Sequence, residues 1–130
     1  MRDSILELLY GIPLGTFQVS KELPYDETGV ALYTRNPKTI YVDYPVEESL
    51  PLFITLGSAD INTTTESVAV YFSTDAKQTP PNLTAIISAI KALKTNIISA
   101  GANKREVVHS IEYAGDLMQV TVEFRFTRIT

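Results

Sequence analysis

The sequence predicts a single α+β domain, in which an antiparallel or mixed β-sheet carries one long helix packed across it and a short N-terminal helix. Three observations predict this class. One helical stripe of apolar residues occurs late in the chain, several short segments alternate apolar with polar residues, and turn-forming residues separate those segments. The chain has 130 residues, which is the usual size of one domain, so residues 1–130 are expected to share one core.

The N-terminus predicts a short helix followed by a weak strand. Ile5, Leu8 and Leu9 recur at helical spacing, and Gly11 follows them as a residue type that commonly ends a helix. The segment TFQVSKEL, residues 16–23, then alternates apolar and polar side chains and predicts a strand.

The middle of the chain predicts strands separated by polar connections. Residues 29–43 are expected to form two short strands around the turn-forming cluster RNPK. Residues 44–51 contain two prolines and two glutamates, which predicts an exposed connection. Residues 52–56 and 68–72 alternate as strands. The polar residues 57–67 between them are expected to form a hairpin that reaches away from the body, or a mobile tip.

The C-terminal part predicts one long helix and a terminal hairpin. An apolar stripe at helical spacing follows two prolines and runs from Leu83 to Ile97, and Gly101 is placed to end this helix. Two strands follow, residues 106–113 and residues 117–127, joined by a compact turn. The last strand is the most regular, with alternate residues suited to a core and to a polar surface.

Composition argues against several functional classes. The net charge is −4, from eleven Lys and Arg against fifteen Asp and Glu, so no basic excess predicts sequence-specific DNA binding. The chain has no cysteine, which excludes disulfides, zinc-thiolate sites and cysteine nucleophiles. The apolar run at the N-terminus is too short and too charged for a signal peptide or a membrane span. We therefore expect a cytoplasmic protein without a membrane partner.

The sequence contains no recognisable catalytic motif. A P-loop, a dinucleotide fingerprint, G-x-S-x-G and H-E-x-x-H are all missing, so neither an enzyme nor a bound cofactor or metal is predicted. His109, the only histidine, lies among apolar residues of its strand, where a core or interface role is commoner than catalysis. Tyr33, Tyr41 and Tyr71 lie opposite core positions, which fits either a second packing layer or an interaction surface.

The order of these elements resembles the tail terminator proteins of long-tailed (siphovirus-type) bacteriophages. The likeness rests on the N-terminal helix, the strands around LYTRNPKTIYVD, the hairpin LFITLGSADINTTTESVAVYFSTD, the helix opened by PPN and the terminal hairpin ending VTVEFRFTRI. It covers nearly the whole chain and is one of size and layout, without an invariant motif. It implies a structural virion protein that forms a homohexameric ring, caps the tail tube and stops its growth.

The same resemblance implies the partners and the location. The ring would contact the tail tube protein and the head completion or connector protein, at the head-proximal end of the virion tail, after assembly in the host cytoplasm. Genomic DNA would pass through the lumen without specific binding, which suits an acidic protein because negative walls repel phosphates. Head-tail joining (neck) proteins have a similar size and architecture and stay an alternative.

Two sets of residues are expected to make contacts in such a ring. The polar face and edge of the last strand are expected to meet a neighbouring subunit, with opposite charges setting the register. The predicted subunit-interface residues are Tyr41, Asp43, Thr121, Glu123 and Arg125. The polar loop is expected to dock onto the tube or the connector, through Ser58, Asp60, Ile61, Asn62 and Thr63.

Two other classes share parts of this layout. One helix on an antiparallel sheet also resembles the hot-dog fold of thioesterases and dehydratases, whose base or nucleophile lies at or near the central helix. Residues 82–99 contain no Asp, Glu or His, and the helix follows most of the strands, which argues against that enzyme class. A dimeric ligand-binding module would need a pocket that no sequence feature reveals.

Overall fold

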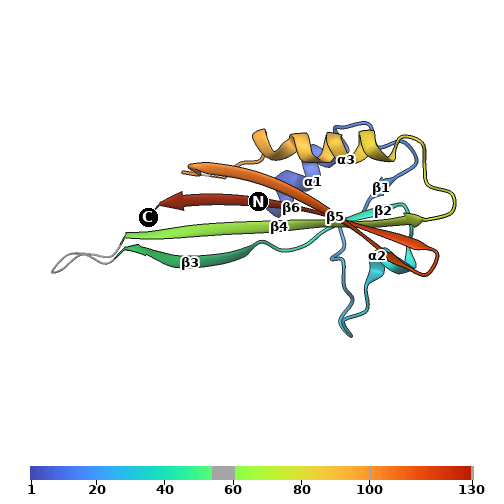
Figure 1. Ribbon diagram of the computed structural model, residues 1–130, viewed down its shortest axis with the longest axis horizontal. Coiled ribbons are helices and arrows are strands. Elements are labelled where there is room, and N and C mark those ends of the chain that lie inside the picture. The colour runs from blue at the N-terminus through green and yellow to red at the C-terminus, as the bar shows by residue number, and fades with distance from the viewer. Residues whose placement is uncertain (54–60, 100, 130) are drawn as a thin grey trace.

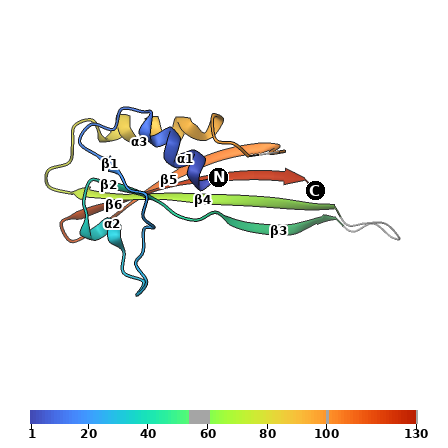
Figure 2. The same ribbon diagram turned by 180° about the vertical axis from the view of Figure 1, so that it is seen from behind.

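Two helices cover one face of a six-stranded mixed sheet. The computed structural model describes residues 1–53, 61–99 and 101–129. Helices α1 (Arg2–Tyr10) and α3 (Leu83–Ala92) lie on one side of the sheet, and the short helix α2 (Leu32–Arg35) lies on the other side (Figure 1). The view from behind shows the same two layers (Figure 2). The α+β class predicted from the sequence is confirmed.

The sheet is mostly antiparallel. Its strands are β1 (Gln18–Val19), β2 (Thr39–Val42), β3 (Val46–Phe53), β4 (Ile61–Asp75), β5 (Lys104–Ala114) and β6 (Leu117–Ile129). Their order across the sheet is β1-β2-β4-β6-β5, and β3 pairs with β4 next to β2. Only β1 and β2 are parallel. The two longest strands, β4 and β6, form the centre of the sheet.

The core lies between the sheet and the two helices α1 and α3. Alternate side chains of β4 and β6 point toward the helices, as the period of a strand requires. The apolar side chains of this layer that are at most 1% exposed are Val68, Val70, Phe72, Val120, Val122, Phe124 and Phe126. The predicted stripe of α3 covers them through Leu83, Ile86, Ile87 and Ile90, all buried. Each such side chain contributes roughly 1.5–3 kcal/mol by leaving water, so this layer stabilises the fold.

The last helix ends earlier than the sequence predicts. Regular α-helix stops at Ala92, a 3-10 turn follows over residues 93–95, and Ile97 is still buried. Arg105 of β5 explains this ending, because its Nη1 donates hydrogen bonds to the carbonyl oxygens of Lys94 (2.9 Å) and Ile97 (2.6 Å). These bonds satisfy carbonyl groups that a helix end leaves without partners.

Two strands are predicted in residues 29–43, and the prediction of the first one is wrong. Part of this segment forms α2 instead, and only the second strand exists, as β2. The carboxylate of Asp26 turns the chain here, because its Oδ1 accepts hydrogen bonds from the backbone nitrogens of Thr28 (2.9 Å) and Val30 (2.8 Å). Such a side-chain bond competes with a strand ladder.

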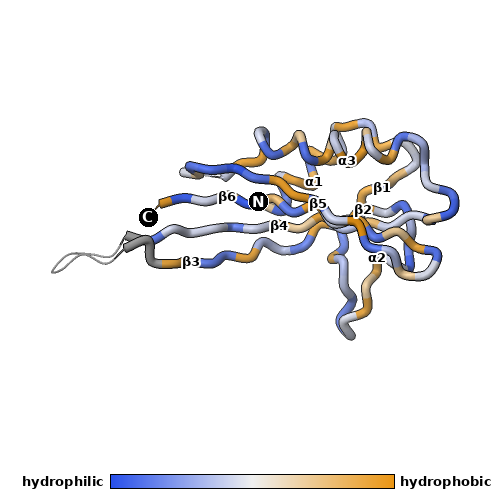
Figure 3. The backbone as a smooth tube through the Cα atoms, in the orientation of Figure 1, coloured by the Kyte–Doolittle hydropathy of each residue, from blue (hydrophilic) through white to orange (hydrophobic). Residues whose placement is uncertain are grey.

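The prediction of an exposed connection at residues 44–51 is also wrong, because most of this segment is strand β3. Residues 46–51 pair with residues 62–67 of β4. Residues 61–67, expected in a polar loop, therefore belong to β4, and residues 54–60 lie outside the described residues. The β3–β4 hairpin extends past the part of the sheet that the helices cover (Figure 1). Its polar character is visible in the pale and blue colours along this half of β4 (Figure 3).

The terminal hairpin is confirmed. Strand β5 ends at Ala114 and β6 begins at Leu117, so a two-residue turn joins them. Gly115 has a φ of 60° at the first position of this turn, which a glycine adopts without steric cost.

Candidate functional site

Helices α1 and α3 pack on one face of the sheet, and the opposite face is largely uncovered by the helices that the structure describes. We call this opposite face the open face. The strand registers place on it the odd-numbered residues of β4 and β6 and the even-numbered residues of β3 and β5. Helix α2 lies on this side, beside β2 (Figure 1). No other described helix lies on the open face (Figure 1).

Three of the predicted interface residues lie together on the open face of β6. These are Thr121, Glu123 and Arg125. The Nε of Arg125 donates to Oε1 of Glu123 at 2.8 Å, and their side chains are 44% and 32% exposed. The prediction that the edge of this strand is free is wrong, because β6 pairs with β4 on one side and with β5 on the other. Strand β6 can therefore contact another molecule through its open face and not through backbone pairing at an edge.

Tyr41 does not lie on an exposed surface, so its predicted outward position is wrong, and its role in the subunit interface stays a prediction. Its side chain is 2% exposed. Tyr41 pairs with Tyr71 across β2 and β4, and its hydroxyl accepts a hydrogen bond from Nδ2 of Asn36 at 3.0 Å. The segment around α2 therefore occupies the position where a neighbouring subunit was expected.

Three tyrosines form a packed layer next to α2. The rings of Tyr33 and Tyr71 stack with their centroids 5.1 Å apart, and Tyr25 meets both rings edge-on, at 5.9 and 6.0 Å. Burial raises the pKa of both Tyr33 and Tyr71 above the ordinary value of a phenol. Of the two interpretations of the tyrosines, packing therefore holds for Tyr33 and Tyr71.

Asp43 and Glu123 border one groove on the open face. Its volume is about 300 Å³, and it is lined by Asp43, Tyr44, Val46, Ser67, Ala69, Tyr71 and Glu123. The two carboxylates act on the same phenol: after burial and Tyr25, they are further causes of the raised pKa of Tyr71. Two predicted interface residues are thus brought to one groove by segments distant in sequence: Asp43 directly follows β2, and Glu123 lies in β6.

A second, more polar groove adjoins the first through Ser67 and Glu123. It measures about 400 Å³ and is lined by Glu48, Thr65, Ser67, Glu106, Glu123, Arg125 and Thr127. Lys104 forms an ion pair with Glu106 at 2.6 Å and holds the pKa of this carboxyl below its usual range. Within the described residues, no group of three or more His, Cys, Asp or Glu is arranged to hold a metal ion. This second groove is therefore polar, and its charged side chains are mainly acidic.

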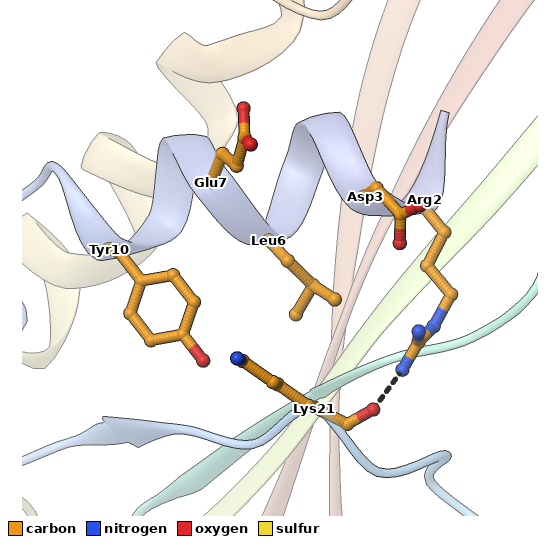
Figure 4. A pocket seen from close by; sticks show the side chains of 6 residues that line it. All are labelled: Arg2, Asp3, Leu6, Glu7, Tyr10 and Lys21. Atoms are coloured by element: carbon orange, nitrogen blue, oxygen red, sulfur yellow. Dashed lines mark hydrogen bonds between the residues drawn. The ribbon is translucent and has the colours of Figure 1, made fainter.

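A separate cleft of about 390 Å³ lies beside α1 (Figure 4). It is lined by Arg2, Asp3, Leu6, Glu7, Tyr10 and Lys21. Arg2 serves the fold here, because its Nε donates to the carbonyl oxygen of Val42 (2.8 Å) and its Nη2 to that of Lys21 (2.6 Å). These bonds tie α1 to β2 and to the segment after β1.

The outer strands β3 and β5 are the surfaces that sequence reasoning missed. Among the described residues, no strand lies beyond β5, and residues 108–114 are all exposed. Strand β3 exposes Val46 (67%) and Leu50 (56%). One signal was present in the sequence, because a proline inside a run that otherwise suits a strand marks an edge strand.

His109 is a surface residue of β5 and not a core residue. Its Nδ1 lies 3.1 Å from Nζ of Lys91 on α3. Since an ammonium can only donate, the ring accepts this hydrogen bond through Nδ1 and carries its proton on Nε2. This pair lies on the helix side of the edge strand. An interface role for His109 stays a prediction.

The predicted docking loop is partly strand. Ile61, Asn62 and Thr63 belong to β4, and the hydroxyl of Thr63 donates to the carbonyl oxygen of Leu50 on β3 at 3.3 Å. Ser58 and Asp60 of the same prediction lie outside the described residues. The residues that can be placed therefore lie in the hairpin that extends from the body.

Comparisons with known proteins add no family to these observations. No protein-family model matches the chain, and no curated protein sequence matches it at a significant level. None of the described helices is both long and apolar enough to cross a membrane. The shape and chemistry of the sheet are therefore the basis for a functional proposal.

Proposed function

We propose that this chain is a structural subunit that assembles into a closed ring through the two free edges of its sheet, and that the ring is the tail terminator of a long-tailed bacteriophage. The observation that carries the proposal is the position of β3 and β5 on opposite sides of the central strands β4 and β6, where neither β3 nor β5 has a second strand partner among the described residues. Both strands expose large apolar side chains, among them Leu50 and Tyr113.

Free strand edges favour association with another chain. A long edge offers a row of unpaired backbone donors and acceptors, and monomeric proteins usually block such rows. Two different edges on opposite sides of one subunit support a head-to-tail contact, and repeated head-to-tail contacts close into a ring when the rotation allows it. The number of six subunits comes from the resemblance to tail terminators alone.

Two further features support the proposed partners. The β3–β4 hairpin extends past the part of the sheet that the helices cover (Figure 1), which suits a contact with the tail tube protein or with the head completion protein. The open face carries Glu48, Glu106, Glu112 and Glu123 against Lys104 and Arg125. Such a face suits a lumen that genomic DNA crosses without specific binding.

The proposal places the protein at the head-proximal end of the tail, after assembly in the host cytoplasm. A head-tail joining protein is the second candidate, because free edges and an extended hairpin serve a connector ring equally well. The two candidates differ in the structure that the ring binds: the open end of a tail tube for a terminator, and the portal or connector for a joining protein.

The test is the mass of the purified protein by light scattering over a concentration series, followed by negative-stain imaging with and without purified tail tubes. We expect closed rings, either alone or once tubes are added, and rings at one end of each tube. Rings that bind connectors and not tubes would favour the joining protein. A stable dimer without rings in either condition would overturn the proposal and direct attention to the hot-dog enzymes.

A further inference from the structure

We infer that β5 of one subunit pairs with β3 of the next copy in antiparallel orientation, so that neighbouring subunits share one continuous antiparallel sheet. This inference rests on the ring proposed above and names the contact that builds it. The occupant of each free edge is therefore a second copy of the same chain.

Strand directions permit this pairing without any turn of the subunit. Strands β3, β4, β6 and β5 are neighbours in this order, and each neighbouring pair is antiparallel. Directions therefore alternate, and the two outer strands run opposite ways. A copy generated by rotation about a ring axis keeps its open face on the same side. Its β3 then meets β5 of the first copy as an antiparallel partner.

The charges of the two edges are complementary. Strand β3 carries Glu47 and Glu48, and it carries no cation over residues 46–53. Strand β5 begins with Lys104 and Arg105, and Lys91 of α3 lies against it through His109. Glu106 and Glu112 follow along the strand, so the part of β5 that complements β3 is its cationic beginning. The carboxylate of Glu47 also accepts from Nη2 of Arg128 at 3.3 Å, but its side chain is 53% exposed. Opposite charges across strands favour one register and one partner.

Pairing of like edges fits these observations less well. Two β3 edges would bring Glu47 and Glu48 of one copy near those of the other, and like charges opposite each other destabilise a sheet. Two β5 edges would form a closed dimer and leave both β3 edges free. Only the β5–β3 contact uses both edges of every subunit.

The contact determines whether odd-numbered or even-numbered residues of the two strands face each other, whatever the stagger, which is the offset between neighbouring subunits along the strand direction. The open face contains even-numbered residues of both β3 and β5. A continuous sheet therefore places even-numbered residues of β3 opposite even-numbered residues of β5. Closure of a sheet into a ring fixes the stagger, and the stagger changes which even residues meet without changing the parity.

Cysteine trapping tests the contact, because the natural chain contains no cysteine. Glu48→Cys is combined, in separate full-length variants, with a cysteine at each even-numbered residue of β5 from Lys104 to Glu112. The matched controls combine Glu48→Cys with a cysteine at each odd-numbered residue from Val107 to Tyr113. Each single-cysteine variant is included. Every variant is assembled under the conditions that give rings, oxidised mildly, and compared on gels with and without reductant.

We expect a reducible ladder of oligomers up to the ring at one or two even positions, with at least about tenfold less cross-link at odd positions, because odd-numbered side chains point to the other face of the sheet and a disulfide cannot join cysteines whose Cβ atoms point apart. Single-cysteine variants should stay uncross-linked. Rings in the microscope without a ladder at any even position would overturn this contact and leave the ring intact. Self-cross-linking of single β5 variants would show a β5–β5 dimer and overturn it too.

The remaining outcomes separate the two proposals. Ladders without closed rings would support the β5–β3 contact and count against the ring. Neither rings nor cross-links, with folding confirmed by circular dichroism, would overturn both.

Discussion

Asn36 donates a hydrogen bond from Nδ2 to the phenolic oxygen of Tyr41, 3.0 Å away. This bond joins the end of α2 to strand β2. The segment around α2 covers Tyr41, which the sequence predicts on an exposed strand face. Tyr41 is 2% exposed as a result. The residue therefore stabilises the subunit, and its substitution tests folding before it tests assembly.

Removal of the Tyr41 hydroxyl should lower the stability of the subunit. We expect Tyr41→Phe to reduce the free energy of unfolding by about 1 kcal/mol, because the hydrogen bond is lost while the ring is kept. Urea denaturation measures this change. Tyr44→Phe is the control, since Tyr44 is 61% exposed, and it should change stability by less than about 0.5 kcal/mol. A folded Tyr41→Asp variant that only loses assembly would restore the interface role of Tyr41.

Arg105 should stabilise the end of the long helix. Its Nη1 bonds two carbonyl oxygens there, and its guanidinium lies over the ring of Phe126, 5.3 Å from the centroid. We expect Arg105→Ala to cost about 2 kcal/mol in the free energy of unfolding. Lys104→Ala is the neighbouring control, because its ion pair with Glu106 is solvent-exposed and such pairs contribute little. Equal losses in the two variants would refute this role.

Ser73 and Thr74 should respond in opposite directions to loss of the hydroxyl. Both are fully buried in β4. The Ser73 hydroxyl donates to the carbonyl oxygen of Tyr33, whereas Oγ1 of Thr74 has no hydrogen-bond partner among the described residues. We expect Ser73→Ala to lower the unfolding free energy by about 1–3 kcal/mol and Thr74→Val to raise it by about 1 kcal/mol, as measured by denaturation. A loss of stability in Thr74→Val would mean that its hydroxyl has a partner in solution.

The stacked tyrosines should make the fold sensitive to alkali. The pKa values of Tyr33 and Tyr71 are raised in the folded chain, chiefly by burial. Their contribution to stability is therefore fully present below the unfolded value of about 10 and is lost as the pH rises toward their folded pKa values. Unfolding free energies measured at increasing pH should fall less steeply for Tyr33→Phe than for the natural chain. Tyr10→Phe, at a tyrosine 55% exposed, should leave the slope unchanged.

Charged substitutions on the edge strand β3 should block assembly without unfolding the subunit. Val46 and Leu50 are 67% and 56% exposed, so the double variant Val46→Lys, Leu50→Lys should change monomer stability by less than about 1 kcal/mol. It should nevertheless abolish rings in light scattering, because lysines on an edge oppose pairing. Ile98→Lys, at an isoleucine 76% exposed, is the control. Rings that persist in the β3 double variant would exclude β3 from the junction.

The periodic spacing of apolar residues correctly predicted the helix α3 and the strand β6, each of which buries one regular row of side chains. The apolar positions of Leu83–Ile90 and of Met118–Phe126 are buried as expected, because a local repeat determines which side of a helix or strand is apolar. The α+β class followed from these elements. The same alternation of apolar and polar residues correctly placed Thr121, Glu123 and Arg125 together on the other face of β6.

The wrong predictions share a physical cause, which is that they depend on contacts between distant segments. Residues 44–51 look like a connection on their own, and they form β3 only because β4 supplies ladder partners. The same holds for the edge of β6, which local sequence cannot distinguish from a free edge. The groove between Asp43 and Glu123 likewise joins residues from different strands.

The sequence alone therefore determined the class of the fold, the stripe of α3 and the buried face of β6, since these depend on residue spacing within a single element. Only the tertiary structure decided that β6 is central, that Tyr41 is covered and that β3 and β5 are the free edges. Strand order depends on pairing between residues far apart in the chain, and neighbouring residues carry almost no information about it.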